Sequence, residues 1–381
     1  MPEIASHIAL VPPSGIRGLF EIALTLDDVN LLAVGEPDVP VAPHIIEAAQ
    51  AAWGRDETNY TANGGLPELR DAIVDKLARD NDVHVDREQV WVTIGATQAL
   101  FQAMGLILDP GDEVLVPDPG YTTFSMNARM LGAVPVAYPL SAERDFQPDL
   151  AALETLITPE TKAIIVNSPS NPLGTVLPAD AVDDILALAQ RHGLWVISDE
   201  VYERFVYDEP HISLASRDTD DRVLSVFSLS KTYALTGIRV GYLVTPPGLA
   251  AVMRTMQEAM ISCVSTPAQR AAIAAITGPQ DAVDEAKRHY RDNLRAATDL
   301  LDRRGIRYLE PRGAFYLWAD VSHATHGDVA SWAERFLLTE RVAVAPGSAF
   351  GRSGEGWIRI CVATGRDRLL QGLEKLPAPA S

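Results

Sequence analysis

The stretch that decides the fold is residues 161–200, TKAIIVNSPSNPLGTVLPADAVDDILALAQRHGLWVISDE. Two short runs in it, 163–167 and 194–198, are almost continuously apolar, as strands are when helices cover both faces of a parallel sheet. Between them, residues 179–192 follow a helical pattern that Pro178 introduces and Gly193 ends. The stretch therefore predicts a strand, a helix and a second, parallel strand.

The same alternation extends in both directions along the chain. Between residues 89 and 244, short β-rich runs alternate with longer helical patterns such as 96–108. This order predicts a doubly wound α/β domain. The predicted strands cover residues 90–94, 113–116, 134–138, 163–167, 194–198, 223–227 and 240–244.

The two flanks have a different pattern. Residues 1–45 are rich in proline and glycine and contain one short helical pattern, at 17–23. We expect a large domain over residues 46–280 and a smaller α+β domain formed by residues 1–45 and 281–381. In the second part of this small domain we expect a long amphipathic helix at 282–304, ended by Gly305, a helix at 328–340, and strands at 314–319, 342–345 and 357–361.

Charge and composition exclude several classes of protein. Over 381 residues, 32 basic groups face 51 acidic ones, and the net charge of −19 disfavours nucleic acid or an anionic membrane as a partner. Two cysteines are too few for a disulfide framework. The N-terminal segment lacks the pattern of a secretory signal, and no apolar run approaches the ~18 residues of a membrane helix. We expect a cytoplasmic protein.

One lysine stands out because lysines are scarce. Lys231 follows the apolar run 223–227 directly, in SLSKTYALTGIRVGY (228–242). A lysine at the end of a buried strand is desolvated, which lowers its pKa and suits it to form a Schiff base. The alternative is a side chain that extends to solvent. The other four lysines lie in polar or helical contexts that we assign to the surface: Lys76, Lys162, Lys287 and Lys375.

Polar residues follow two other predicted strands. Asp199 and Glu200 end the run 194–198, at the carboxyl edge where open parallel sheets bind ligands. They could equally cap a following helix. Asn171 lies in NSPSNPLG (167–174), where prolines and a glycine hold the loop rigid, although an Asn-Pro pair also forms simple turns.

An anion site is predicted where a strand meets a helix at Gly95-Ala96-Thr97. Free backbone N–H groups at a helix start bind phosphate, and Arg239 could add a contact. The segment matches neither a P-loop nor a G-x-G-x-x-G fingerprint, so a nucleotide is not indicated. His323 and His326 lack companions at ligand spacing, and we expect no metal site.

Taken in order, these pieces resemble the pyridoxal-phosphate-dependent aminotransferases of class I/II, fold type I, and most closely their bacterial and archaeal aspartate/aromatic branch. The resemblance implies a large domain with a mostly parallel seven-stranded sheet flanked by helices, and a smaller α+β domain. The matching segments, besides those quoted above, are GEPDVP (35–40), NYTANGGLPELR (59–70), IGATQAL (94–100), PDPGYTTF (117–124), SDEVYERFVYD (198–208), RGAFYLW (312–318) and RICVATG (359–365).

The resemblance also implies catalytic roles. Lys231 would hold pyridoxal 5′-phosphate as an aldimine and then move a proton between the substrate Cα and C4′. Asp199 would pair with the pyridine nitrogen, and Tyr202 and Asn171 would hydrogen-bond the 3′-oxygen of the ring. Tyr121 would stack on the ring face.

The remaining implied roles concern the phosphate and the substrate. Ala96, Thr97, Ser228 and Arg239 would hold the phosphate, and Tyr60 would reach the phosphate of a neighbouring subunit, which implies a homodimer with shared active sites. Arg359 would pair with the substrate α-carboxylate, helped by the backbone near Gly35 and by Asn171, and cis peptides are expected before Pro119 and Pro172.

Two departures from the family pattern bear on the substrate. Thr97 stands where some aspartate aminotransferases of this branch have a lysine for the distal carboxylate, and Ile238 replaces a common tryptophan. We therefore predict an aminotransferase that moves the amino group of an aromatic, neutral or aspartate-like L-amino acid to a 2-oxo acid such as 2-oxoglutarate, by a ping-pong mechanism.

Two alternatives stay open. The first is a β-lyase, decarboxylase or amino-acid oxidase on the same scaffold, because one fold and cofactor support several outcomes. The second is a non-catalytic pyridoxal-phosphate-binding module of the kind found in some transcription regulators. The acidic chain leaves no length for the basic DNA-binding domain that such regulators carry.

Overall fold

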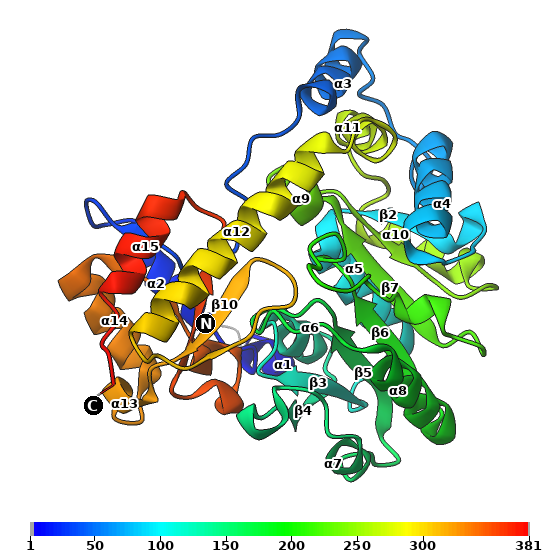
Figure 1. Ribbon diagram of the computed structural model, residues 1–381. Coiled ribbons are helices and arrows are strands. Elements are labelled where there is room, and N and C mark those ends of the chain that lie inside the picture. Colours follow the sequence, from blue (N-terminus) through cyan, green and yellow to red (C-terminus); the bar gives the residue numbers. More distant parts are fainter. Residues whose placement is uncertain (1–3, 380–381) are drawn as a thin grey trace.

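The large part of the molecule is built on a seven-stranded sheet, with a strand at each of the seven predicted positions (Figure 1). The computed structural model describes residues 4–379. Within them, seven strands pair in the order β2-β8-β7-β6-β5-β3-β4, and all pairs are parallel except those of β8 with β2 and β7. The fold class is confirmed. The strands are β2 Val90–Thr93, β3 Glu113–Asp118, β4 Val134–Pro139, β5 Thr161–Asn167, β6 Trp195–Asp199, β7 Val223–Ser228 and β8 Gly241–Val244.

Both faces of this sheet are buried, as the continuous apolar runs predict. Ile164 of β5 packs in one core cluster with Ile185 of helix α8, and the next residue, Ile165, packs in another with Leu100 of helix α5. Successive strand residues point to opposite faces, so helices must cover each face. Helix α8 spans Ala179–His192 as predicted, and Gly193 ends it with a left-handed φ of 66°.

The helices of the large part surround the sheet, and several of them were not predicted individually. Helix α3 projects outward at the top of Figure 1 and packs on α11. The helices are α3 Pro43–Gly54, α4 Pro67–Asn81, α5 Gly95–Ile107, α6 Thr123–Met130, α7 Leu150–Glu154, α8 Ala179–His192, α9 Leu229–Thr232, α10 Ala250–Met260 and α11 Thr266–Thr277.

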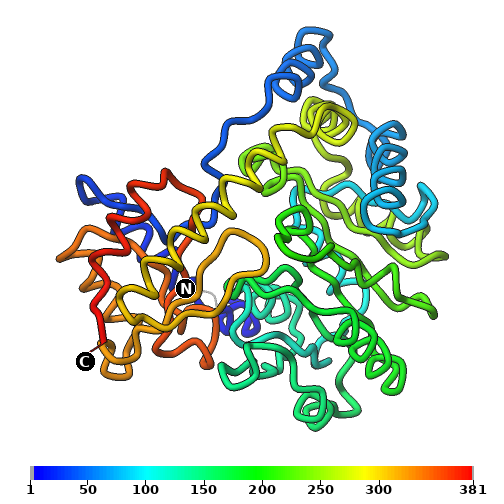
Figure 2. The backbone as a smooth tube through the Cα atoms, in the orientation of Figure 1, coloured from blue at the N-terminus to red at the C-terminus, as the bar shows by residue number. Residues whose placement is uncertain are grey.

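The small part brings together the two ends of the chain (Figure 2), since β1 near the N-terminus pairs in parallel with β11. The long helix α12 runs diagonally across Figure 1 toward it. A second sheet has the order β12-β13-β10-β9, all antiparallel. The elements are α2 Gly15–Ala23, β1 Asn30–Leu31, α12 Asp281–Arg303, β9 Tyr308–Leu309, β10 Tyr316–Asp320, α13 Ser322–Thr325, α14 Val329–Glu340, β11 Val342–Ala343, β12 Ala345–Pro346, β13 Trp357–Cys361 and α15 Arg366–Glu374. The short helix α1 Ser6–Ala9 packs on α6 of the large part.

Two details of the predicted small domain are wrong. The strand expected at 342–345 is divided between β11 and β12, which belong to different sheets. The strand expected at 314–319 begins two residues later, because Ala314 has a φ of 57° and cannot continue an extended strand. The domain boundaries at residues 46 and 280 stay a prediction.

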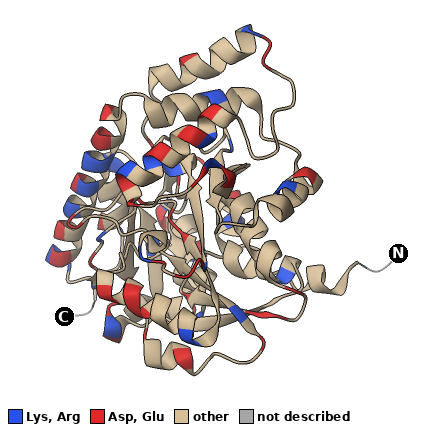
Figure 3. Cartoon of the chain, turned by 90° about the vertical axis from the view of Figure 1, so that its right-hand side faces the viewer, with Lys and Arg blue, Asp and Glu red and all other residues tan. Residues whose placement is uncertain are grey.

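Positions of acidic and basic residues follow one another along several helices (Figure 3). Among residues 4–379, no helix combines the length and the hydropathy needed to cross a membrane.

Candidate active site

Three neighbouring strands end at the same edge of the sheet, and each ends in a polar residue. Asn167, Asp199 and Ser228 are the last residues of β5, β6 and β7. Beyond this carboxyl edge, where open parallel sheets bind ligands, lies a cavity of about 500 Å³. Its lining contains every predicted site residue except Tyr60: Gly35, Ala96, Thr97, Tyr121, Asn171, Asp199, Tyr202, Ser228, Lys231, Arg239 and Arg359.

Tyr60 is the predicted residue that does not line this cavity. It lies between α3 and α4, and 89% of it is exposed. A side chain so exposed is free to contact a second molecule.

Lys231 is held inside the cavity rather than extended to solvent. It sits in α9, directly after β7, and its Nζ donates to the Gly35 carbonyl at 2.7 Å. The pKa of Lys231 is lowered to about 8, mainly by burial and also by the guanidinium groups of Arg359 and Arg239, while Cys361 and Glu36 oppose this effect. Roughly a tenth of the amine is therefore unprotonated at pH 7, and this is the form that acts as a Schiff-base nucleophile.

Asp199 is a buried acid at the floor of the cavity, 3% exposed. Burial raises its pKa to about 7; the Val201 N–H, which donates to Asp199 Oδ1 at 3.3 Å, opposes this effect, and the neighbouring Glu200 adds to it. Residues 201–204 form a turn, so Asp199 does not cap a helix. A carboxyl group in this position is best stabilised as a carboxylate by a cationic partner, such as a protonated pyridine nitrogen.

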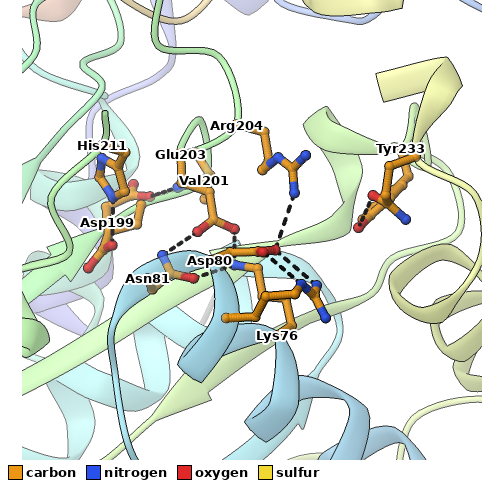
Figure 4. A network of polar contacts seen from close by, with 12 residues as sticks. Lys76, Asp80, Asn81, Asp199, Val201, Glu203, Arg204, His211 and Tyr233 are labelled. Carbon is orange, nitrogen blue, oxygen red and sulfur yellow. Dashed lines mark hydrogen bonds and ion pairs between the residues drawn. The ribbon is translucent and has the colours of Figure 1, made fainter. Parts of the chain in front are cut away.

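The turn after Asp199 is anchored by a buried polar network (Figure 4). Lys76 of α4 pairs with Glu203 and donates to Asn81 Oδ1 at 2.9 Å, and Asn81 Nδ2 donates to Glu203 Oε2 at 2.6 Å. Lys76 is only 5% exposed, so its predicted surface position is wrong. Its Nζ also lies 4.8 Å from the centre of the Phe227 ring, which helps to offset the cost of burying the charge.

A second buried carboxylate lies beside Asp199. Glu200 accepts hydrogen bonds from Ser198 Oγ and from His211 Nε2, each at 2.8 Å. These contacts fix Ser198 and Glu200, the residues that precede and follow Asp199. The position of Asp199 is therefore fixed by both of its neighbours along the chain.

Arg359 on β13 is packed between two aromatic rings. Its guanidinium carbon lies 4.4 Å from the centre of the Tyr316 ring and 4.8 Å from that of Phe350. Its Nη1 donates to Asn171 Oδ1 at 2.7 Å, and its Nη2 donates to the Ala33 carbonyl at 2.5 Å. Its Nε is buried and has no partner among residues 4–379. The group is thus fixed in orientation and retains donor capacity for a carboxylate.

Tyr316 is a site residue that the sequence reasoning missed. Its hydroxyl lies 2.6 Å from that of Tyr202, and it lines the cavity. A Cβ at Gly35 would lie 2.0 Å from Tyr316 Oη, so only glycine fits there. Strand alternation within RGAFYLW places Tyr316 on the same face as Trp318, which pairs with Arg359, but that pairing depends on a distant segment of the chain.

The opposite end of the cavity can hold an anion. Helix α5 begins at Gly95 without a side-chain cap, so the N–H groups of its first turn are open. A Cβ at Gly95 would lie 2.5 Å from Arg239 Nη2, which means that the guanidinium lies against the helix start. Arg239 Nη1 is fixed by the Thr236 carbonyl at 2.7 Å, and Ser228 supplies a hydroxyl nearby.

These residues fit pyridoxal phosphate. A phosphate matches the helix start with Arg239, a protonated ring nitrogen matches Asp199, and an aldehyde matches Lys231. The peptide bonds before Pro119 and Pro172 are cis, as predicted, and a third cis bond precedes Pro169.

Comparisons with known proteins agree with this fit. Residues 27–375 match the family model described as aminotransferase class I and II. Aspartate aminotransferase of Pyrococcus abyssi is 37% identical over 378 residues, 98% of this chain and 97% of that protein. Aromatic-amino-acid aminotransferase 2 of Thermococcus litoralis is 33% identical, again over 98% and 97%. The structure of Thermus thermophilus aspartate aminotransferase with maleate has a TM-score of 0.93 at 35% identity, covering 98% of this chain and 99% of that one.

Fold and site together define a pyridoxal-phosphate-dependent enzyme of fold type I. The chain belongs to the class I and II aminotransferases. It transfers an amino group from an amino acid to a 2-oxo acid, and this reading is favoured over a lyase, a decarboxylase or an oxidase.

Proposed function

We propose that this aminotransferase uses an aspartate-like or aromatic L-amino acid as donor and 2-oxoglutarate as acceptor, in two half-reactions at one cavity. The observation that carries the proposal is the convergence of Lys231, Asp199 and Arg359 on that cavity. The relatives named for aspartate and for aromatic amino acids support the same two donor classes.

Bound pyridoxal phosphate supplies an aldehyde for the amino group and an electron-withdrawing ring. In our proposal, Lys231 Nζ would hold the aldehyde in the resting enzyme, and its free amine would move a proton at the substrate Cα. Its lowered pKa, about 8, suits it to both tasks because it can accept and return a proton near neutral pH.

Asp199 would pair with the ring nitrogen and favour its protonated form, and its burial would strengthen the pairing. Tyr202 and Asn171 would donate to the 3′-oxygen of the ring, while Tyr121 would pack against the ring face. The N–H groups of Ala96 and Thr97, with Ser228 and Arg239, would hold the phosphate.

Arg359 binds the α-carboxylate of every substrate, and Asn171 and the backbone near Gly35 orient it. The stacking of Arg359 on Tyr316 and Phe350 supports this role, because a guanidinium fixed in one plane presents its donors to a carboxylate without further loss of conformational freedom.

We also propose a homodimer in which Tyr60 reaches the phosphate of the neighbouring subunit. The 89% exposure of Tyr60 supports it, and the exposed Trp53 and Ile46 on nearby α3 add apolar area for an interface. The two cysteines, Cys263 and Cys361, are unpaired, which supports a cytoplasmic location.

Half-reaction spectroscopy tests the proposed function. A donor amino acid should abolish the absorbance of the Lys231-bound cofactor, and 2-oxoglutarate should restore it. The Lys231→Ala protein is the control and should show neither that absorbance nor turnover. Release of ammonia and a 2-oxo acid in the absence of an acceptor would instead indicate a lyase.

A further inference from the structure

The buried carboxylate of Asp118 has no role in the proposed function. Asp118 is the last residue of β3 and is 9% exposed. Its Oδ1 accepts the backbone N–H of Ser353 at 3.0 Å, and its Oδ2 accepts the backbone N–H of Arg352 at 3.2 Å. Burial raises the pKa of Asp118, and these two N–H groups oppose the effect. The carboxylate is therefore paired with the backbone of a segment far along the chain.

These contacts connect the large part of the molecule with the small part. Asp118 belongs to the large sheet, whereas Arg352 and Ser353 lie in a short helical turn between β12 and β13. Gly351 has a φ of 140°, and a Cβ there would lie 2.0 Å from Asp118 Oδ1, so only glycine allows so close an approach. A third hydrogen bond runs in the opposite direction, since the Gly120 N–H donates to the Phe350 carbonyl at 2.8 Å. Three hydrogen bonds thus join residues 118–120 to residues 350–353.

Each of the two joined segments lies next to a residue of the proposed site. Tyr121 directly follows Gly120 and lines the cavity. Phe350 is 4% exposed, and the centre of its ring lies 4.8 Å from the guanidinium carbon of Arg359. The hydrogen bonds therefore connect the segment that leads into Tyr121 with the side chain on which Arg359 is stacked.

We propose that Asp118 is a positioning residue that fixes Arg359 relative to the cofactor ring by holding residues 350–353 on the end of β3. The inference rests on the proposed function, in which Arg359 binds the α-carboxylate and Lys231 moves the proton at Cα. Arg359 lies on β13 of the small part and Lys231 on α9 of the large part, so their separation depends on contacts between the two parts. A hydrogen bond to a carboxylate is stronger than one between neutral groups, which suits Asp118 to hold such a contact.

The alternative is that Asp118 only stabilises the fold. In that case its removal lowers stability but leaves the folded holoenzyme with the kcat of wild type. Under our proposal kcat falls, because a misplacement of about 1 Å between reacting groups can cost about 100-fold in rate. KM changes little, since the donor groups of Arg359 remain intact.

The test compares the steady-state kinetics of wild type, Asp118→Ala and Asp118→Asn as holoenzymes. Asp118→Ala should lower kcat about 10- to 100-fold for an acidic and an aromatic donor alike, and should change KM by less than about threefold. Asp118→Asn keeps the volume of the side chain and one acceptor oxygen, so its loss of kcat should be smaller, and it decides the outcome if Asp118→Ala does not fold.

Asp112→Ala is the matched control. Asp112 precedes the other end of β3, where its Oδ2 accepts the Asp109 N–H at 2.9 Å, and it does not line the cavity. This variant also loses a carboxylate that binds backbone, but its kcat should stay within about twofold of wild type, because no residue of the site depends on that contact.

Hydrogen exchange gives a readout that needs neither cofactor nor turnover. In the cofactor-free protein, the amides of Arg352 and Ser353 should exchange at least about tenfold faster in Asp118→Ala than in wild type, because both lose their acceptor, and should be unchanged in Asp112→Ala. Unchanged exchange in Asp118→Ala would overturn the inference, as would a kcat equal to that of wild type or a loss of kcat as large in Asp112→Ala. If wild type transaminated no donor, the proposed function would fail, while the exchange rates would still decide whether Asp118 holds residues 350–353.

Discussion

At the scale of single residues, the site depends on side chains whose surroundings shift their chemistry. Lys231 and Asp199 face one cavity, and burial moves the pKa values of both toward neutrality. Burial makes the charged form of each group more costly than it is in water. A cofactor that reacts with the amine and pairs with the acid removes both penalties, so binding it stabilises the fold.

Replacement of Asp199 by Asn should change how stability depends on pH. The folded pKa of about 7 lies above the ordinary value of 3.8, so folded Asp199 holds its proton over a range in which the unfolded chain has lost it. Cofactor-free wild type therefore loses stability as the pH rises from about 4 to 7, by up to about 4 kcal/mol at about 1.4 kcal/mol per pKa unit.

The Asp199→Asn protein lacks this loss of stability with rising pH. Thermal melts of the two cofactor-free proteins from pH 4 to 8 should show a Tm difference that grows in favour of the variant and levels off above pH 7. A difference that does not vary with pH would contradict the buried-acid assignment. The holoenzyme of the variant should lose most of its turnover, because the ring nitrogen loses its anionic partner.

Arg359→Lys keeps the charge but loses the planar fork and the stacking between Tyr316 and Phe350. We expect kcat/KM to fall about 10- to 100-fold for every amino-acid donor, because all share the α-carboxylate. Steady-state kinetics with an acidic, an aromatic and a small neutral donor checks this. Arg352→Lys, at an exposed position nearby, is the control; a loss limited to one donor would argue against the role of Arg359.

At the scale of elements, the turn after β6 packs against α4 through a buried ion pair. Lys76 of α4 pairs with Glu203 of the turn, and both side chains are almost fully buried. Removing one partner leaves the other charge without compensation in a region of low dielectric constant. The turn also carries Tyr202, which lines the cavity, so the ion pair links the packing of α4 to the geometry of the site.

Lys76→Met should lower the free energy of unfolding by roughly 3–5 kcal/mol, because it leaves the buried Glu203 carboxylate without its cationic partner. Urea unfolding of the cofactor-free protein measures the change. The double variant Lys76→Met, Glu203→Met should recover much of the loss, and Lys162→Met, at an exposed lysine, should have little effect. If the double variant were as unstable as Lys76→Met alone, the ion pair would not be the cause.

At the scale of the whole molecule, the proposed homodimer would complete each active site with Tyr60 from the other subunit. The cavity lies at the carboxyl edge of the sheet, between the large and small parts, and the exposed Tyr60 does not line it. In a homodimer with shared sites, this residue would act on the other subunit. The arrangement is a prediction that solution measurements can decide.

Tyr60→Phe removes one hydroxyl and should weaken the affinity for pyridoxal phosphate about 10-fold or more, because a hydrogen bond to a charged phosphate is lost. Titration of the cofactor-free protein measures the affinity, and light scattering measures the mass, which should be that of a dimer for wild type and variant alike. A monomeric wild type, or an unchanged affinity, would contradict the shared site.

Local sequence patterns and long-range packing determine different features of this protein. Apolar runs and turn residues predicted every strand of the large sheet and the bounds of α8, because these patterns are local. The same reasoning placed Lys76 on the surface and passed over Tyr316, because nothing within a few residues of either reveals its partner. The prediction of a single strand at 342–345 was wrong for the same reason, since the division of this segment between two sheets depends on distant strands.

The sequence by itself determined the α/β class, the motifs of the family and the identity of most residues around the cavity, since strand ends and glycine turns are encoded in short spacings. Only the tertiary structure decided which side chains meet. Arg359 bonds to Asn171 across 188 positions, Lys76 pairs with Glu203 across 127, and Arg17 reaches the cavity from a helix near the N-terminus. Such contacts arise from packing between elements, and the sequence pattern of neither partner alone specifies them.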